Sequence, residues 1–275
     1  MWNFYDELCT GIPSGIRIDQ CIVGEKLTVV SAADHIGVAR TLCPVDAETE
    51  KLAKTVEHTF LRDAANWMKW DCPVRACIGV AAMNAFYNRS TRLADGVSVE
   101  FCGEINGKKV TLIGDLPEME ECLKVRSNLT VLPLPEECGL DAQYDNAMIA
   151  DVVVISGDAL INRTLPALLA KVGDGVKVIL AGFSVPAAPV FFAFGNPVHG
   201  LICRYAETDS VEEVLRGSGM NTFRIAPEKP SYVHDNPEVT RYNTSPYKAS
   251  KFNSAFNPWE GKEYDGDSWS PIFLG

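Results

Sequence analysis

This chain of 275 residues has few basic residues. It contains 25 Lys and Arg against 36 Asp and Glu, and its formal net charge is −11. An acidic surface repels nucleic-acid phosphates and anionic lipid headgroups. We therefore expect neither nucleic acid nor a membrane surface as the main partner. The hydrophobic content of 47% and the charged content of 22% are typical of globular proteins and exclude a disordered or fibrous chain.

Motifs that bind nucleotide phosphates are also absent. The glycine pair at 217–219 follows a predicted helix rather than a strand, so it lacks the context of a dinucleotide-binding fingerprint. No Walker-type phosphate loop occurs. An activity that depends on NAD or a nucleoside triphosphate thus has no motif in its favour.

A secretory signal is not visible at residues 1–7, and we expect a cytoplasmic protein. The charge-free segment 178–198 is long enough to span a bilayer, but its prolines and glycines predict a strand, a turn and a short helix over 187–194. Nine scattered cysteines indicate reduced thiols. Cys72 and Cys77 form one spaced pair, yet a closed zinc site needs four ligands and no second pair follows.

The apolar pattern predicts an α/β protein with two domains and a C-terminal extension. Residues 16–40 show the short β-branched runs of antiparallel strands, and 48–88 show helical spacing. This α+β domain covers 1–95. Over 100–226, continuous Val, Ile and Leu runs alternate with short helices, which predicts a Rossmann-like domain around a parallel sheet. The aromatic-rich extension 227–275 has no regular period and is expected to pack on a surface.

Candidate binding residues follow the strands of the predicted parallel sheet. Ligands bind beyond the carboxyl ends of such strands, where glycines let backbone approach and polar side chains converge. The residues at these ends are Gly114, Asp115, Gly157, Asp158, Gly182 and Ser184. Asp115 has a second interpretation, because an aspartate three residues before Glu118 resembles a capping box for the next helix.

Five further polar residues stand out from their surroundings. Asn84 interrupts an apolar helical pattern, and Asn162 precedes the helix that Thr164 is predicted to cap. Asp34 and His35 lie in a glycine-flanked turn, where His35 is either a ligand, a base or simply solvated. We expect these five to belong to the same binding cleft.

Several segments, taken in order, resemble one bacterial and archaeal family, in which an enolase N-terminal-like domain (DUF4213) precedes a Rossmann-like domain (DUF364) that is described as a heavy-metal chelation domain. The matching segments are 2–8, 81–85, 110–117, 150–157, 160–165 and 182–186. The resemblance implies a cleft between the two domains and a role with heavy metals or metal-bearing small molecules. Asp115 stands where the family tends to carry a histidine, and Asp158 and Arg163 replace smaller residues, which favours a different, charged ligand.

Three functions remain open at this point. The first is a binding or chelation protein, in which Asp115, Asp158 and His35 hold a divalent metal or a metal-bearing cofactor. The second is an enzyme on a small charged metabolite, with Asp115 or Asp158 as the general base. The third is an assembly subunit that docks its C-terminal extension on a partner or a second copy. A homo-oligomer is expected.

Overall fold

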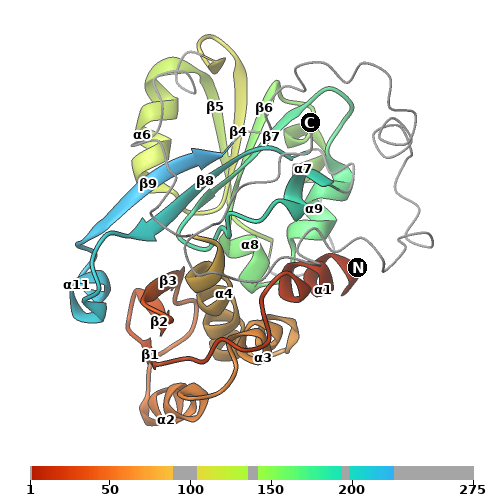
Figure 1. Cartoon of the computed structure of the whole chain (residues 1–275). Helices are drawn as coiled ribbons and strands as arrows, with labels where there is room; N and C mark the ends of the chain where they lie inside the picture. Colours follow the sequence, from red (N-terminus) through yellow and green to blue (C-terminus); the bar gives the residue numbers. More distant parts are fainter. Residues whose placement is uncertain (1, 89–103, 136–141, 194–197, 226–275) are drawn as a thin grey trace, which may run out of the picture.

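A computed structural model describes residues 2–88, 104–135, 142–193 and 198–225. The chain forms a small antiparallel sheet with helices and a larger, mostly parallel sheet, as the sequence predicts (Figure 1). The predicted domain boundary at 95–100 and the extension 227–275 lie outside the described residues.

The N-terminal part places three strands and a set of helices around a hairpin. The sheet has the order β1-β2-β3 and is antiparallel throughout. Ala33 and Asp34 join β2 to β3 with positive φ angles of 49° and 62°, the conformation of a type I′ hairpin turn. The elements are α1 (Trp2–Thr10), β1 (Gln20–Val23), β2 (Leu27–Ala32), β3 (His35–Arg40), α2 (Ala47–Val56), α3 (Leu61–Ala65), the 3-10 helix η1 (Asn66–Lys69) and α4 (Pro73–Tyr87).

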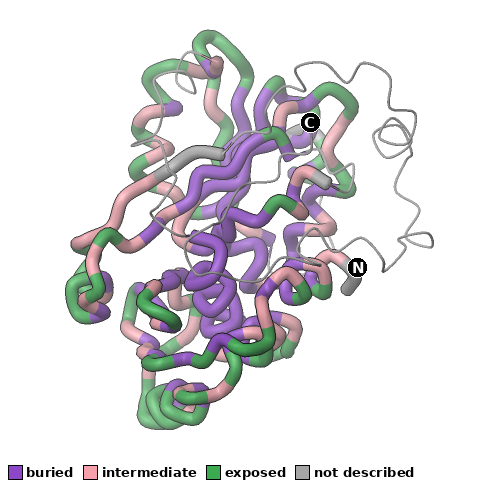
Figure 2. Tube along the Cα trace, viewed as in Figure 1, coloured by how far each residue is buried: buried purple, intermediate pink, exposed green. Residues whose placement is uncertain are grey.

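Helix α4 lies at the centre of the molecule. All its residues from Ala76 to Tyr87 are buried, because its sequence is apolar around the whole circumference rather than on one face. It packs against β2 and β3 of the small sheet and against α3 and α8. Figure 2 shows the buried helix between the small sheet and the large one.

The large sheet has the strand order β5-β4-β6-β7-β8-β9. The first five strands are parallel, which confirms the prediction, whereas β9 is an antiparallel edge strand. The chain leaves β4 toward β5 on one side and then crosses to β6 on the other. The elements are β4 (Lys109–Ile113), α6 (Pro117–Arg126), β5 (Asn128–Leu132), α7 (Gln143–Ala147), β6 (Val152–Ser156), α8 (Asp158–Ile161), α9 (Leu165–Lys171), β7 (Lys177–Gly182), α10 (Val190–Ala193), β8 (Val198–Ala206), α11 (Val211–Leu215) and β9 (Met220–Ile225).

Two local predictions are wrong. Helix α6 is capped by Leu116 without a side-chain hydrogen bond, so Asp115 forms no capping box; its carboxylate is engaged in an ion pair instead. Helix α10 (Val190–Ala193) begins three residues later than predicted, because Pro186 and Pro189 keep the preceding segment out of the helix. No helix among the described residues is long and apolar enough to cross a membrane.

The small sheet is covered on both faces. One hydrophobic core runs from α1 and α4 into the large sheet and includes Leu8, Met83, Val153 and Leu180. On its other face, the small sheet packs Val29 and Val38 against α11 in a second cluster. Because the two parts share buried surface, the end of β3 is held against the loops of the large sheet.

Candidate functional site

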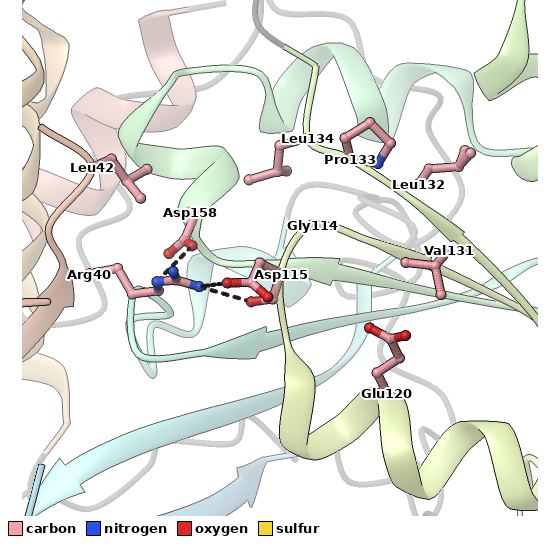
Figure 3. A pocket seen from close by; sticks show the side chains of 10 residues that line it. All are labelled: Arg40, Leu42, Gly114, Asp115, Glu120, Val131, Leu132, Pro133, Leu134 and Asp158. Carbon is pink, nitrogen blue, oxygen red and sulfur yellow. Dashed lines mark hydrogen bonds and ion pairs between the residues drawn. The ribbon is translucent and has the colours of Figure 1, made fainter.

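A pocket of about 450 Å³ lies at the carboxyl ends of β4, β5 and β6. The strand order reverses at β4, and the crevice beyond such a switch point is where open parallel sheets bind ligands. The small sheet contributes the end of β3 to the same place. The lining residues are Arg40, Leu42, Gly114, Asp115, Glu120, Val131, Leu132, Pro133, Leu134 and Asp158 (Figure 3).

Arg40, the last residue of β3, lies between two carboxylates of the large sheet (Figure 3). Its Nη1 atom is 2.7 Å from Asp115 Oδ2 and donates to the Asp115 carbonyl at 3.1 Å. Its Nε atom is 3.6 Å from Asp158 Oδ2. One guanidinium therefore joins the ends of β4 and β6 to the end of β3.

The two carboxylates differ in their surroundings. The Asp115 side chain is 68% exposed, whereas that of Asp158 is 3% exposed. Ser184 Oγ donates to Asp158 Oδ1 at 2.7 Å and accepts from the backbone N–H of Arg40 at 3.1 Å. Burial raises the pKa of Asp158, while the bond from Ser184 and the charge of Arg40 oppose that rise. Asp158 is thus a carboxyl group that is held in place and keeps its proton to higher pH than usual.

The raised pKa of Asp158 predicts a definite pH dependence of stability. The folded state binds this proton more tightly than the unfolded state, so the stabilisation is complete below the unfolded pKa of about 4 and is lost as pH rises through the folded pKa. We expect the free energy of unfolding of the wild type, relative to Asp158→Asn, to fall as pH rises through that window. Urea unfolding at successive pH values measures it.

Ser184→Ala serves as the matched variant for this measurement. It removes the hydrogen bond that lowers the pKa of Asp158, so the fall in stability should extend to higher pH. If the free energy of unfolding of the wild type, relative to Asp158→Asn, rises with pH, the raised pKa of Asp158 is contradicted.

The three predicted glycines allow close approach of loops within the protein. A Cβ at Gly114 would lie 2.6 Å from Ser156 Cβ, and one at Gly157 would lie 2.5 Å from Val185 Cγ2. Gly182 has a φ of 114°, which favours glycine. The structure therefore explains these glycines by packing around the pocket, and only Gly114 lines it.

Asn84 holds the small sheet to the loop after β7. Its Nδ2 donates to the carbonyls of Val38 at 2.6 Å and Phe183 at 2.8 Å, and its buried Oδ1 has no hydrogen-bond partner among the described residues. Asn88, one turn later, was not identified from the sequence. It carries a fuller set of bonds, donating to Val185 and Arg204 carbonyls and accepting from Ala187 N–H. Its position at the end of α4 gave no signal in the sequence.

The remaining predicted residues do not line the pocket. His35 and Asp34 are at the opposite end of β3, and six residues of strand extend roughly 20 Å. Asn162 accepts from Thr164 Oγ1 at 3.0 Å, so Thr164 stands at the cap position of α9 but bonds Asn162 rather than the helix. Arg163 donates to the Trp70 carbonyl and the Asp71 carboxylate. Of the predicted residues, the structure thus brings Asp115, Asp158 and Ser184 to Arg40, with Gly114 lining the same pocket.

A directly bound metal ion does not fit this arrangement. The Arg40 cation stands between Asp115 and Asp158, and His35 is remote from both. Among the described residues, no three His, Cys, Asp or Glu side chains converge in a way that could hold a metal ion. The pocket therefore offers a cation and an apolar wall rather than a set of metal ligands.

Two family models match the chain, DUF364 over residues 98–224 and DUF4213 over residues 5–87, and both are described as "Putative heavy-metal chelation". A solved structure of a DUF364-family protein of unknown function from Desulfitobacterium hafniense DCB-2 is 25% identical, with a TM-score of 0.70 over 82% of this chain and 98% of the other. A second, from Pyrococcus horikoshii, is 17% identical, with a TM-score of 0.62 over 81% of this chain and 98% of the other. None of the curated proteins compared with the chain matches it.

Proposed function

Because the chain belongs to the family that joins a DUF4213 domain to a DUF364 domain, we propose that it binds a small acidic molecule of the kind that chelates heavy-metal ions. The ligand lies in the pocket beside Arg40. The observation that carries this proposal is the position of the Arg40 guanidinium. It contacts the buried carboxyl group of Asp158 and the exposed carboxylate of Asp115.

Asp115 occupies the place that an acidic ligand would take. An ion pair with an exposed side chain such as Asp115 contributes only about 0–1 kcal/mol, so exchange of the Asp115 carboxylate for a ligand carboxylate is easy. Asp158 keeps the guanidinium in place during the exchange, and Ser184 holds both Asp158 and the backbone of Arg40. A carboxylate can bind an arginine through two parallel hydrogen bonds, which gives the ligand a defined orientation.

The rest of the pocket suits the body of a small organic molecule. Apolar side chains from β5 and the segment after it form one wall, and its volume of about 450 Å³ is in the usual range for such sites. Glu120 supplies a further carboxylate at the wall (Figure 3). Oxygen donors of this kind can complete the coordination of a metal that arrives as cargo of the ligand.

Titration calorimetry on the full chain tests the proposal with citrate, nitrilotriacetate, the nickel complex of nitrilotriacetate, and nickel alone. We expect the acidic probes to bind and Arg40→Ala to weaken them about 10–100-fold, the effect of losing charge-assisted hydrogen bonds. Arg216→Ala is the control. Arg216 is an exposed arginine at the end of α11 that pairs with Glu212, and neither residue lines the pocket. Binding of nickel alone, or unchanged binding by Arg40→Ala, would overturn the proposal.

An enzyme is the second candidate, and the burial of Asp158 favours it. A carboxyl group with a raised pKa at the wall of a pocket is suited to accept or donate a proton at a higher pH than an ordinary aspartate. The same titration distinguishes the two functions, because a binding protein releases its probe unchanged whereas an enzyme returns a product.

A further inference from the structure

The charges that line the pocket are unequal. Arg40 is the one cation among the described residues that line it, whereas Asp115, Glu120 and Asp158 are three acids (Figure 3). The side chains of Asp115 and Glu120 are 68% and 26% exposed, so both carboxylates are accessible to a ligand. Glu120 also has a partner outside the lining, Lys124, whose Nζ is 2.5 Å from Oε1. A ligand in this pocket therefore meets more negative than positive charge.

A ligand that carries only carboxylates leaves one acid of the pocket without its partner. In the proposed exchange, the ligand carboxylate takes the place of the Asp115 carboxylate, which now lies 2.7 Å from Arg40 Nη1. Two negative groups then lie beside one guanidinium, and like charges at this range repel each other. A cationic group on the ligand removes the repulsion, because it pairs with the displaced Asp115 carboxylate. The ligand carboxylate and Asp115 then each have a partner of opposite charge.

The apolar part of the pocket suits a hydrophobic side chain. Leu42 and Val131 are 37% and 41% exposed, and they belong to a small set of large hydrophobic residues that are exposed in the described part of the chain. Both line the pocket. Removing such apolar surface from water is favourable. The body of the ligand is therefore expected to be apolar rather than to carry further charges.

We propose that the ligand is an α-amino acid with an apolar side chain. Its carboxylate binds Arg40, its ammonium group binds Asp115, and its side chain lies on the wall that includes Leu42 and Val131. Glu120 supplies a second negative charge in the same pocket, which favours the cationic group. The amino nitrogen, once it has released its proton, and the carboxylate of such a molecule can chelate a metal ion together. This inference therefore deepens the proposed function and rests on it.

Titration calorimetry of the full chain at neutral pH tests it with L-phenylalanine and 3-phenylpropanoate, which has the same ring and carboxylate but no amino group. We expect the wild type to bind phenylalanine about 10–100-fold more tightly, the effect of one charge-assisted hydrogen bond. Asp115→Asn should remove most of this preference. It frees Arg40 for 3-phenylpropanoate, which gains affinity, and it removes the partner of the ammonium group, so phenylalanine does not gain. A purely structural Asp115 would affect both probes alike.

Glu121→Gln is the matched control, because Glu121 is an exposed acid of α6 that does not line the pocket. It should keep the preference for phenylalanine. The inference is overturned if the wild type binds the two probes equally or takes no phenylalanine, if Asp115→Asn retains the preference, or if Glu121→Gln loses it. In each of these cases, binding of citrate and nitrilotriacetate that depends on Arg40 leaves the proposed function intact. A wild type that binds none of the four probes overturns both.

Discussion

Gly37→Ala is expected to destabilise the chain by about 3 kcal/mol or more, a large part of the 5–15 kcal/mol that holds a typical protein folded. A Cβ at Gly37 would lie 1.9 Å from Ala85 N and 2.1 Å from Ala81 O. Both atoms belong to the backbone of α4, which cannot turn aside as a side chain can. The strand and the helix would have to separate.

Urea unfolding followed by circular dichroism measures this effect. Gly15→Ala is the control, because nothing lies within 4 Å of a Cβ there, and it should be neutral or stabilise by up to about 1 kcal/mol. Arg40 is three residues beyond Gly37 on the same strand, so the variant should also weaken binding in the pocket. A Gly37→Ala protein as stable as the wild type would contradict the packing of β3 on α4.

Asn88→Ala is expected to destabilise by about 3–5 kcal/mol, because it leaves two buried backbone groups and one partly buried one without their partner, and each such group costs about 1–3 kcal/mol. Asn88 closes the end of α4 on the loop after β7 and on β8. Few other side chains connect so many segments. The loss should appear as a lower midpoint of urea unfolding without a change in slope.

Asn84→Ala is the internal comparison and should cost less, about 1–3 kcal/mol. It removes two hydrogen bonds, to Val38 and Phe183, but also a buried oxygen that has no partner among the described residues. Asn84 in α4 and Asn88 at its end are both buried, so a difference in burial does not explain why Asn88→Ala should cost more. If Asn84→Ala is the more destabilising change, the hydrogen bonds of Asn88 are not the main link between the end of α4 and the large sheet.

Local sequence was sufficient for most of the fold. The continuous apolar run at Val152–Ser156 predicted a strand buried on both faces, and Thr222 and its neighbours in β9 were missed because an antiparallel edge strand lacks that signature. The helical spacing predicted over 48–88 includes α4, which begins at Pro73, a residue that suits the first turn of a helix. The capping box at Asp115 failed because its carboxylate found a stronger, charged partner in Arg40.

The candidate site was predicted only in part. The rule that ligands bind at the ends of parallel strands pointed to Asp115, Asp158 and Ser184, and the structure places these three around one guanidinium. The same reasoning had no means to select Arg40, which is a single charge at the end of a strand in another sheet. Asp34 and His35 were chosen in its place from the turn before Gly37.

The sequence by itself determined which segments are strands and helices. The spacing of hydrophobic residues and the choice of turn residues set the local backbone conformation, and both can be recognised within a few neighbouring positions. The tertiary structure alone decided that Arg40 meets Asp115 and Asp158. Those contacts join segments far apart in the chain. They depend on the order of strands in the large sheet and on the packing of β3 against α4, and neither leaves a pattern in neighbouring residues.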